Sequence, residues 1–68
     1  MIVRVNGEEH ELPEGATVAG AVALFAPDHP PRGIAVAVDG EVVPRASWPE
    51  AVLAPGARVE VVTAIQGG

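Results

Sequence analysis

The chain offers few side chains that could act as a nucleophile. It contains no cysteine, and its only hydroxyl groups belong to Thr17, Ser47 and Thr63. Covalent catalysis needs such a group within hydrogen-bond reach of a base that a third residue orients. Each of the three hydroxyls instead falls where a helix cap, a turn or a strand is expected. We therefore predict that the protein is not an enzyme.

The titratable residues do not suggest a metal or cofactor site either. His10 falls in an expected strand and His29 in a proline-rich loop, without the spacing of a ligand pair, and we expect both to be exposed and structural. Glu8, Glu9 and Glu11 are interpreted as a charged sheet edge that resists aggregation. No glycine-rich loop joins a strand to a helix, so the sequence lacks a phosphate-binding loop. We predict no bound metal and no bound cofactor.

The C-terminal segment is the one part of the chain whose residues suit a reaction. Its last residues are Ile65, Gln66, Gly67 and Gly68. We expect residues 1–65 to form one domain and residues 66–68 a flexible tail. Glycines without Cβ can enter a narrow channel in an extended conformation, and an unhindered glycine carboxyl is easily attacked once one oxygen can leave. Gly68 is therefore predicted to be modified by another protein; the alternative is an ordinary frayed terminus.

The length and the net charge of the chain argue against several classes of function. A chain of 68 residues forms one small domain, with little room for a deep cleft. Nine acidic residues against four arginines give a net charge of −5, which argues against nucleic acid and anionic membranes as partners. The longest apolar run, residues 21–27, is far shorter than a membrane span, and no signal-peptide pattern opens the chain. These features predict a cytoplasmic protein.

Alternation of apolar and polar residues predicts several strands. Asn6-Gly7 predicts a hairpin, because a type I′ turn needs a positive φ at both central residues. Asp39-Gly40 is a second turn signal. The expected strands are residues 1–5, 8–12, 34–38 and 58–65, with a short extended segment at 41–43.

One helix is expected between the second and third strands. Thr17 is its predicted N-cap, and Pro27 ends it. Its apolar stripe consists of Val18, Ala21, Val22 and Phe25. Further along, Ser47 is expected to cap an irregular turn, and Trp48 to close the open end of the small core. Arg45 has two possible roles, an ion pair with an acidic loop or a contact with a partner.

The order of these elements predicts a β-grasp fold of the α+β class. In this arrangement one main helix covers one face of a mixed sheet of four to five strands, and the first and last strands lie side by side and parallel. The other face of the sheet stays uncovered, and uncovered apolar faces tend to be interfaces. We therefore expect a docking face there; the alternative is an ordinary half-solvated sheet. Its candidate residues are Ala35, Ala37, Val62 and Ala64.

Two segments of the chain resemble the sulfur carrier proteins of thiamine biosynthesis, the ThiS family, which has a ubiquitin-like β-grasp fold. One is Ala35-Val-Ala-Val-Asp-Gly-Glu-Val-Val-Pro-Arg-Ala-Ser-Trp48, and the other ends in Ile65-Gln66-Gly67-Gly68. A terminal Gly-Gly is shared with ubiquitin-like proteins and the small subunit of molybdopterin synthase. Val-Pro-Arg followed by Trp is typical of the thiamine branch. The chain departs from the family at Ala57, where an Asp is usual, and in a helix that is poor in leucine.

The resemblance implies a chemistry at Gly68. An adenylating enzyme of the ubiquitin-activating type would use ATP to activate the Gly68 carboxylate, and a persulfide supplied by a donor such as a cysteine desulfurase would convert it to a thiocarboxylate. Thiazole synthase would then take the sulfur for the thiazole ring of thiamine. The free carrier is expected to be a monomer. The absence of lysine fits this chemistry, since an activated terminus finds no side-chain amine in its own chain to acylate.

The sequence is also compatible with three other functions. The chain could carry sulfur for tRNA thiolation or molybdopterin. It could be a ubiquitin-like modifier that is conjugated through Gly68. It could also be a β-grasp interaction module with an incidental glycine tail.

Overall fold

The computed structural model describes residues 1–28 and 31–63. The predictions for His29 and for residues 64–68 therefore lie outside the described residues. Between these limits the chain forms five strands, one α-helix and two short 3₁₀ helices, η1 and η2. In chain order they are β1 (Ile2–Val5), β2 (Glu8–Glu11), α1 (Val18–Phe25), η1 (Pro31–Gly33), β3 (Ile34–Val38), β4 (Glu41–Val42), η2 (Arg45–Glu50) and β5 (Arg58–Thr63).

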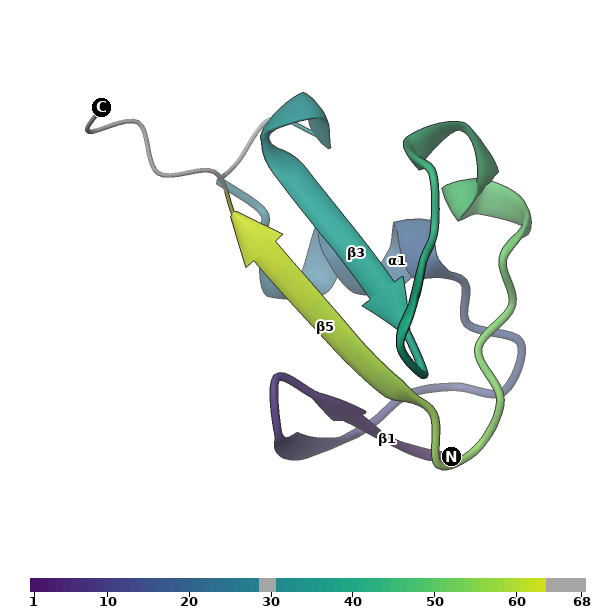
Figure 1. Ribbon diagram of the computed structural model, residues 1–68. Helices are drawn as coiled ribbons and strands as arrows, with labels where there is room; N and C mark the ends of the chain where they lie inside the picture. The colour runs from purple at the N-terminus through teal and green to yellow at the C-terminus, as the bar shows by residue number, and fades with distance from the viewer. Residues whose placement is uncertain (29–30, 64–68) are drawn as a thin grey trace.

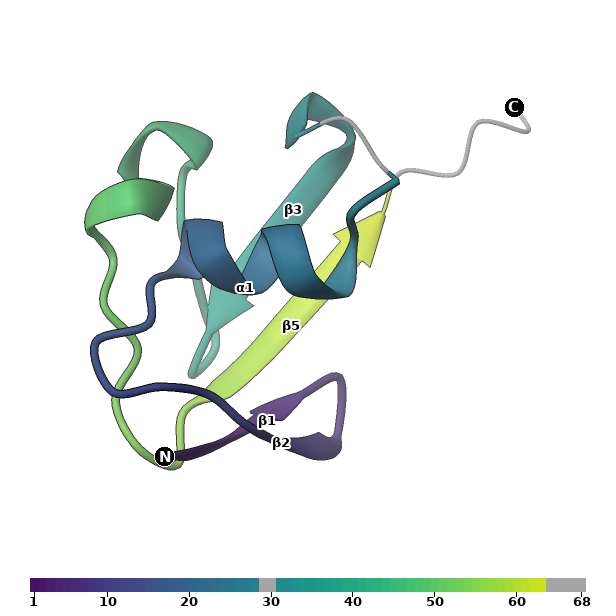
Figure 2. The ribbon, with the colours of Figure 1, turned by 180° about the vertical axis from the view of Figure 1, so that it is seen from behind.

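The five strands form one mixed sheet in the order β2-β1-β5-β3-β4. The first and last strands, β1 and β5, are parallel neighbours, whereas the other pairs are antiparallel. Figure 1 views the sheet from one face, with α1 behind β3 and β5, and Figure 2 shows α1 crossing the opposite face. The predicted β-grasp arrangement of the α+β class is confirmed, with five strands.

Both predicted hairpin turns adopt the expected backbone conformation. The φ angles are 51° at Asn6 and 86° at Gly7, and 52° at Asp39 and 87° at Gly40. A type I′ turn requires positive φ at both central residues, and Asn, Asp and Gly tolerate that region best. These two turns set the register of β1 with β2 and of β3 with β4.

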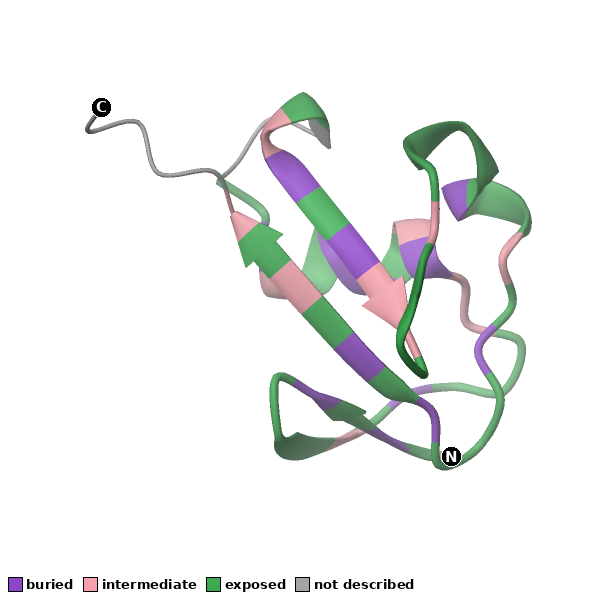
Figure 3. Cartoon of the chain, viewed as in Figure 1, coloured by how far each residue is buried: buried purple, intermediate pink, exposed green. Residues whose placement is uncertain are grey.

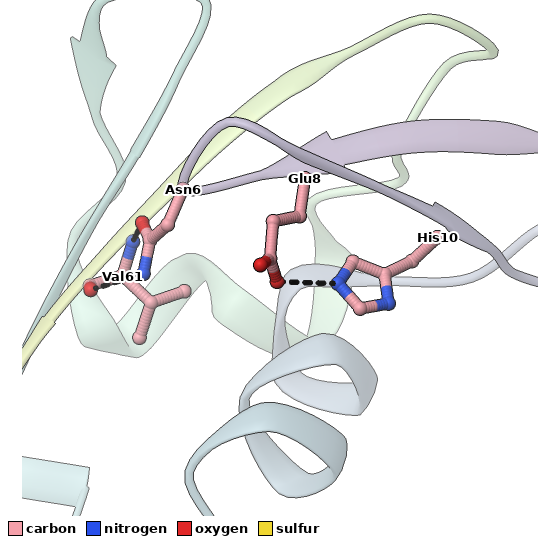
Figure 4. A network of polar contacts seen from close by, with 4 residues as sticks. All are labelled: Asn6, Glu8, His10 and Val61. Atoms are coloured by element: carbon pink, nitrogen blue, oxygen red, sulfur yellow. Dashed lines mark hydrogen bonds and ion pairs between the residues drawn. The ribbon is translucent and has the colours of Figure 1, made fainter.

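Asn6 also fastens its hairpin to the last strand. Its Nδ2 donates to the Val61 carbonyl oxygen at 3.1 Å, and its Oδ1 accepts from the Val61 N–H at 2.8 Å (Figure 4). One amide side chain therefore takes the place of a backbone pair between two segments 55 residues apart.

Substitutions of Asn6 separate the contribution of these bonds from that of the turn. Asn6→Gly keeps the positive φ and loses both hydrogen bonds, which should lower the free energy of unfolding by about 1–2 kcal/mol. Asn6→Ala loses the same two hydrogen bonds and in addition places a Cβ at a positive φ, which should lower the free energy of unfolding by about 1 kcal/mol more than Asn6→Gly does. Urea unfolding of the three proteins measures both steps. Equal stability of all three would show that neither the bonds nor the turn contributes.

The core lies between the sheet and α1. Residues of β1 alternate between buried and exposed positions, whereas β3 alternates over its first three residues and β5 alternates exposed with buried or intermediate positions, as Figure 3 shows for β3 and β5. From α1, Val18, Ala21 and Val22 are buried as the stripe predicts, while Phe25 is half-buried. Thr17 caps the helix by accepting the Gly20 N–H at 3.2 Å. The buried residues described are Val3, Val5, Leu12, Val18, Ala21, Val22, Ala26, Ile34, Val36, Trp48, Leu53, Ala57 and Val59.

Trp48 closes one end of this core, as predicted. It is 4 % exposed, and its indole Nε1 donates to the Val43 carbonyl oxygen at 2.9 Å. Its element, η2, packs against α1. Burial of the ring together with a partner for its N–H satisfies both the apolar and the polar part of the side chain.

The prediction that Ser47 caps a turn is wrong. The 3₁₀ helix η2 begins two residues earlier, at Arg45, and Pro44 occupies the cap position without a side-chain capping bond. Ser47 lies inside η2, where its N–H donates to the Pro44 carbonyl oxygen at 2.8 Å. Pro44 has φ −58°, a value that its ring imposes and that already suits the start of a helical turn.

Candidate functional site

The candidate site is built around the end of β5, which leads toward the C-terminal residues. Thr63 is the last described residue of β5, and its register partner is Ile34 at the start of β3. The tail residues Ile65, Gln66, Gly67 and Gly68 and the boundary between residues 65 and 66 lie outside the described part of the chain. The predictions made for them stay predictions.

The face of the sheet away from α1, here called the open face, carries small and apolar side chains near this end. Ala35 and Val62 are register partners, as are Ala37 and Val42. Val62 is 62 % exposed and Val42 75 % exposed, values high for such apolar side chains. Three of the four predicted docking residues, Ala35, Ala37 and Val62, therefore lie close together on one face, and Ala64 is outside the described residues.

Two shallow hollows follow this apolar part of the open face. One of about 200 Å³ is bordered by Ala37, Val42 and Glu60, and one of about 210 Å³ by Arg32 and Gly33; Ala35 and Val62 border both. The small alanine side chains between larger valines produce these depressions. A convex apolar side chain of a partner could fit there.

Val42 belongs to this surface but was not among the predicted site residues. Its place depends on the Asp39-Gly40 turn, which sets Val42 opposite Ala37. A two-residue type I′ turn fixes that register from the sequence alone, so the turn itself was the signal that could have identified Val42.

His10 differs from the prediction that it is exposed. Val3 is its register partner on the core side of the sheet, and the His10 ring lies 4.6 Å from the Phe25 ring, centroid to centroid. Glu8 approaches from the same side, with its Oε1 at 3.7 Å from the His10 Nε2 (Figure 4). His10 is consequently half-buried between the sheet and the end of α1, because strand alternation directs it toward the helix.

The glutamates of β2 are exposed, and β2 is an edge strand of the sheet. This agrees with the interpretation of a charged edge that discourages pairing with other chains. Arg45 is also exposed, and it makes no ion pair with any residue in the ranges 1–28 and 31–63.

The described residues show no catalytic or metal-binding cluster. No three His, Asp or Glu side chains among them are grouped so that they could hold a metal ion. The Thr17 hydroxyl is occupied by its capping bond. None of the helices in the described ranges has the length and apolar character needed to cross a bilayer.

The fold defines a class: a small β-grasp domain with an apolar open face and a last strand parallel to the first. The family model for the ThiS family matches residues 3–68, and the chain belongs to that family of sulfur carriers. The match includes the final Gly67-Gly68 pair, which the described part of the structure does not reach.

Solved structures agree with this fold. The crystal structure of the thiamine biosynthesis protein (ThiS) from Geobacter metallireducens has a TM-score of 0.79 and 24 % sequence identity, with full coverage of both chains. The NMR solution structure of a thiamine biosynthesis protein from the same organism has a TM-score of 0.81 and 23 % identity, covering 100 % of this chain and 88 % of that one. None of the curated proteins compared with the chain matches it.

Proposed function

We propose that the protein carries sulfur as a thiocarboxylate on Gly68 and delivers it for formation of the thiazole ring of thiamine. In this proposal the chain is a substrate of other enzymes and holds no cofactor of its own. The observation that carries the proposal is the family match, which extends over residues 3–68 and so includes both terminal glycines. The likeness to thiamine biosynthesis proteins of known structure supports it at the level of the fold.

The proposed chemistry has three steps. An adenylating partner transfers AMP from ATP to the Gly68 carboxylate, and pyrophosphate leaves. The terminal sulfur of a persulfide, for instance on a cysteine desulfurase, then attacks the carbonyl carbon, and AMP leaves with the C–O electron pair. A thiol finally cleaves the S–S bond, which releases the thiocarboxylate and a disulfide. Thiazole synthase is the proposed acceptor of the sulfur.

The open face supports this proposal as the surface on which the partners dock. In its apolar part, Ala35 and Val62 lie near the end of β5 from which the chain continues to Gly68, and Ala37 and Val42 adjoin them beside Glu60. A partner that covers this surface would hold the carrier while the tail enters its active site. Water exclusion around an exposed apolar patch is a common source of binding energy.

A charge placed on the open face should therefore impair activation. We expect Val62→Glu to lower kcat/KM for adenylation of the carrier at least about tenfold, which corresponds to ~1.4 kcal/mol of binding. Leu24→Glu is the matched control, because Leu24 on α1 is 63 % exposed against 62 % for Val62. Equal effects of the two substitutions on kcat/KM would exclude the open face as the docking surface.

The function is tested by reconstitution. The purified protein is incubated with the adenylating enzyme of its own organism, ATP, a cysteine desulfurase, cysteine and a thiol, and its intact mass is measured. Replacement of one carboxyl oxygen by sulfur supports the proposal, and transfer to thiazole synthase in a second stage identifies the pathway. Adducts on target lysines would support a ubiquitin-like modifier instead, and a chain that stays unmodified would contradict both.

A further inference from the structure

A pair of arginines lies on the open face, beyond the apolar docking surface. Arg4 on β1 and Arg58 on β5 are register partners on neighbouring parallel strands, and both are exposed. They border a hollow of about 310 Å³ together with Gly7, Gly40 and Glu60. Half of the four positive side chains of this acidic protein are therefore placed side by side.

The arrangement does little for the stability of the fold. Like charges directly opposite each other on adjacent strands repel and are destabilising. Arg4 has one counter-ion, Glu9, at 3.6 Å between Nη2 and Oε2, and both side chains are more than half exposed, where such pairs contribute little. The Arg58 guanidinium makes no ion pair with any of the described residues.

Neither of the other acidic residues near the pair, Asp39 or Glu60, forms an ion pair with Arg4 or Arg58. Asp39 uses its Oδ1 to accept the backbone N–H of Arg58 at 2.9 Å, so this carboxylate caps the strand. Glu60 follows Arg58 on the same face of β5, and it borders both this hollow and the apolar one beside Val42. The arginine pair is therefore continuous with the proposed docking surface.

Two of the residues that border the hollow, Gly7 and Gly40, have no side chain. A Cβ built at either position would meet no atom within 4 Å. Guanidinium groups bind carboxylates through two parallel N–H···O bonds. Two such groups, side by side and accessible, fit an acidic segment of another protein.

We propose that Arg4 and Arg58 bind a carboxylate-bearing segment of the adenylating partner and so fix the orientation in which the carrier docks. This inference rests on the proposed function, because it concerns the same open face. A carrier of net charge −5 is attracted as a whole to basic surfaces, and such attraction speeds encounter without selecting one orientation. The arginine pair, in contrast, requires an acidic group at one position of the partner, and this requirement selects one docking orientation.

The test compares single substitutions that change the net charge equally. Arg4→Gln and Arg58→Gln each remove one positive charge from the pair, whereas Ala23→Glu adds one negative charge on the exposed side of α1. The dissociation constant for the adenylating partner is measured for all four proteins at low and high ionic strength. We expect each arginine variant to bind about tenfold more weakly at low salt, with a smaller difference at high salt. Ala23→Glu should bind within about twofold of the parent chain.

Two results would overturn the inference while the proposed function stands: arginine variants that bind like the parent chain, or an Ala23→Glu variant that loses as much affinity as they do. The second result would assign the effect to overall charge. A parent chain that binds the partner and yet receives no sulfur would refute the proposed function alone. Melting curves of all variants check that each is folded. We expect this result because these surface substitutions remove no buried contact.

Discussion

A chain that lacks Gly68 is expected to receive no sulfur, and its melting temperature should equal that of the full chain. In the proposed chemistry the reacting atom is the carboxyl carbon of Gly68, so the deletion moves the carboxylate to Gly67 and shortens the reach into the partner's active site. Misplacement of a reacting group by one residue is enough to lose the geometry that catalysis requires. Intact-mass measurement after reconstitution, with a thermal melt of the same sample, checks both parts.

The stability part of this expectation follows from the position of the core. The buried residues described run from Val3 to Val59, so the deletion removes none of them. A variant with one additional alanine after Gly68 is the matched control, because it keeps every native residue and displaces only the carboxylate. Sulfur transfer to either variant at the parent rate would contradict the assignment of Gly68, and a large drop in melting temperature would show that the terminus is structural.

Replacement of Trp48 by Ala should have the largest effect on stability, a loss of about 3–5 kcal/mol in the free energy of unfolding. The ring is 4 % exposed, and its removal leaves a cavity between η2 and α1 and takes the hydrogen bond from the Val43 carbonyl oxygen. Native proteins are stable by only about 5–15 kcal/mol in total, and the core of a domain below about 70–80 residues rarely supplies more than about 3–5 kcal/mol. Urea unfolding followed by circular dichroism measures the loss.

Trp48→Phe separates the ring from its N–H group. Phenylalanine restores most of the apolar contact but no donor to Val43, so we expect it to recover more than half of the stability lost in Trp48→Ala.

The same substitutions should leave sulfur transfer unchanged. Under conditions in which the Trp48→Ala protein is still folded, its sulfur transfer per folded molecule should match that of the parent chain. A reduced transfer rate with unchanged stability would instead place Trp48 in a partner contact.

Features of the fold that depend on neighbouring residues could be predicted from the sequence. Asn6-Gly7 and Asp39-Gly40 form the expected turns because only a few residues accept positive φ. Thr17 caps α1 because its hydroxyl reaches a backbone N–H within one turn. One long-range feature could also be predicted: the parallel pairing of β1 with β5 follows from the order of the elements, because few topologies place one helix on one face of the sheet.

Contacts between individual residues far apart in the sequence could not be predicted in the same way. The contact of His10 with Phe25 joins β2 to the end of α1 and requires the packed structure. The bonds of Asn6 to Val61 span 55 residues. The prediction for Ser47 failed for a local reason instead, because Pro44, and not a side-chain oxygen, sets the start of η2.

The candidate site also has a part that the sequence predicts and a part that only the folded chain shows. Gly67 and Gly68 stand out from residue type and position alone, and the alternation of β3 and β5 indicates an apolar open face. The neighbourhood of Arg4 and Arg58 depends on the register between the first strand and the last, which no local pattern encodes. The pairing of these two charges is therefore visible only in the folded chain.

Fragment mass spectrometry of the reconstituted protein can establish whether sulfur is carried on the carboxyl carbon of Gly68. We expect the C-terminal fragment that contains Gly68 to gain the mass difference between sulfur and oxygen only when ATP and the sulfur donor are both present. The same gain on a fragment that lacks Gly68, or no gain on any fragment, would contradict this expectation.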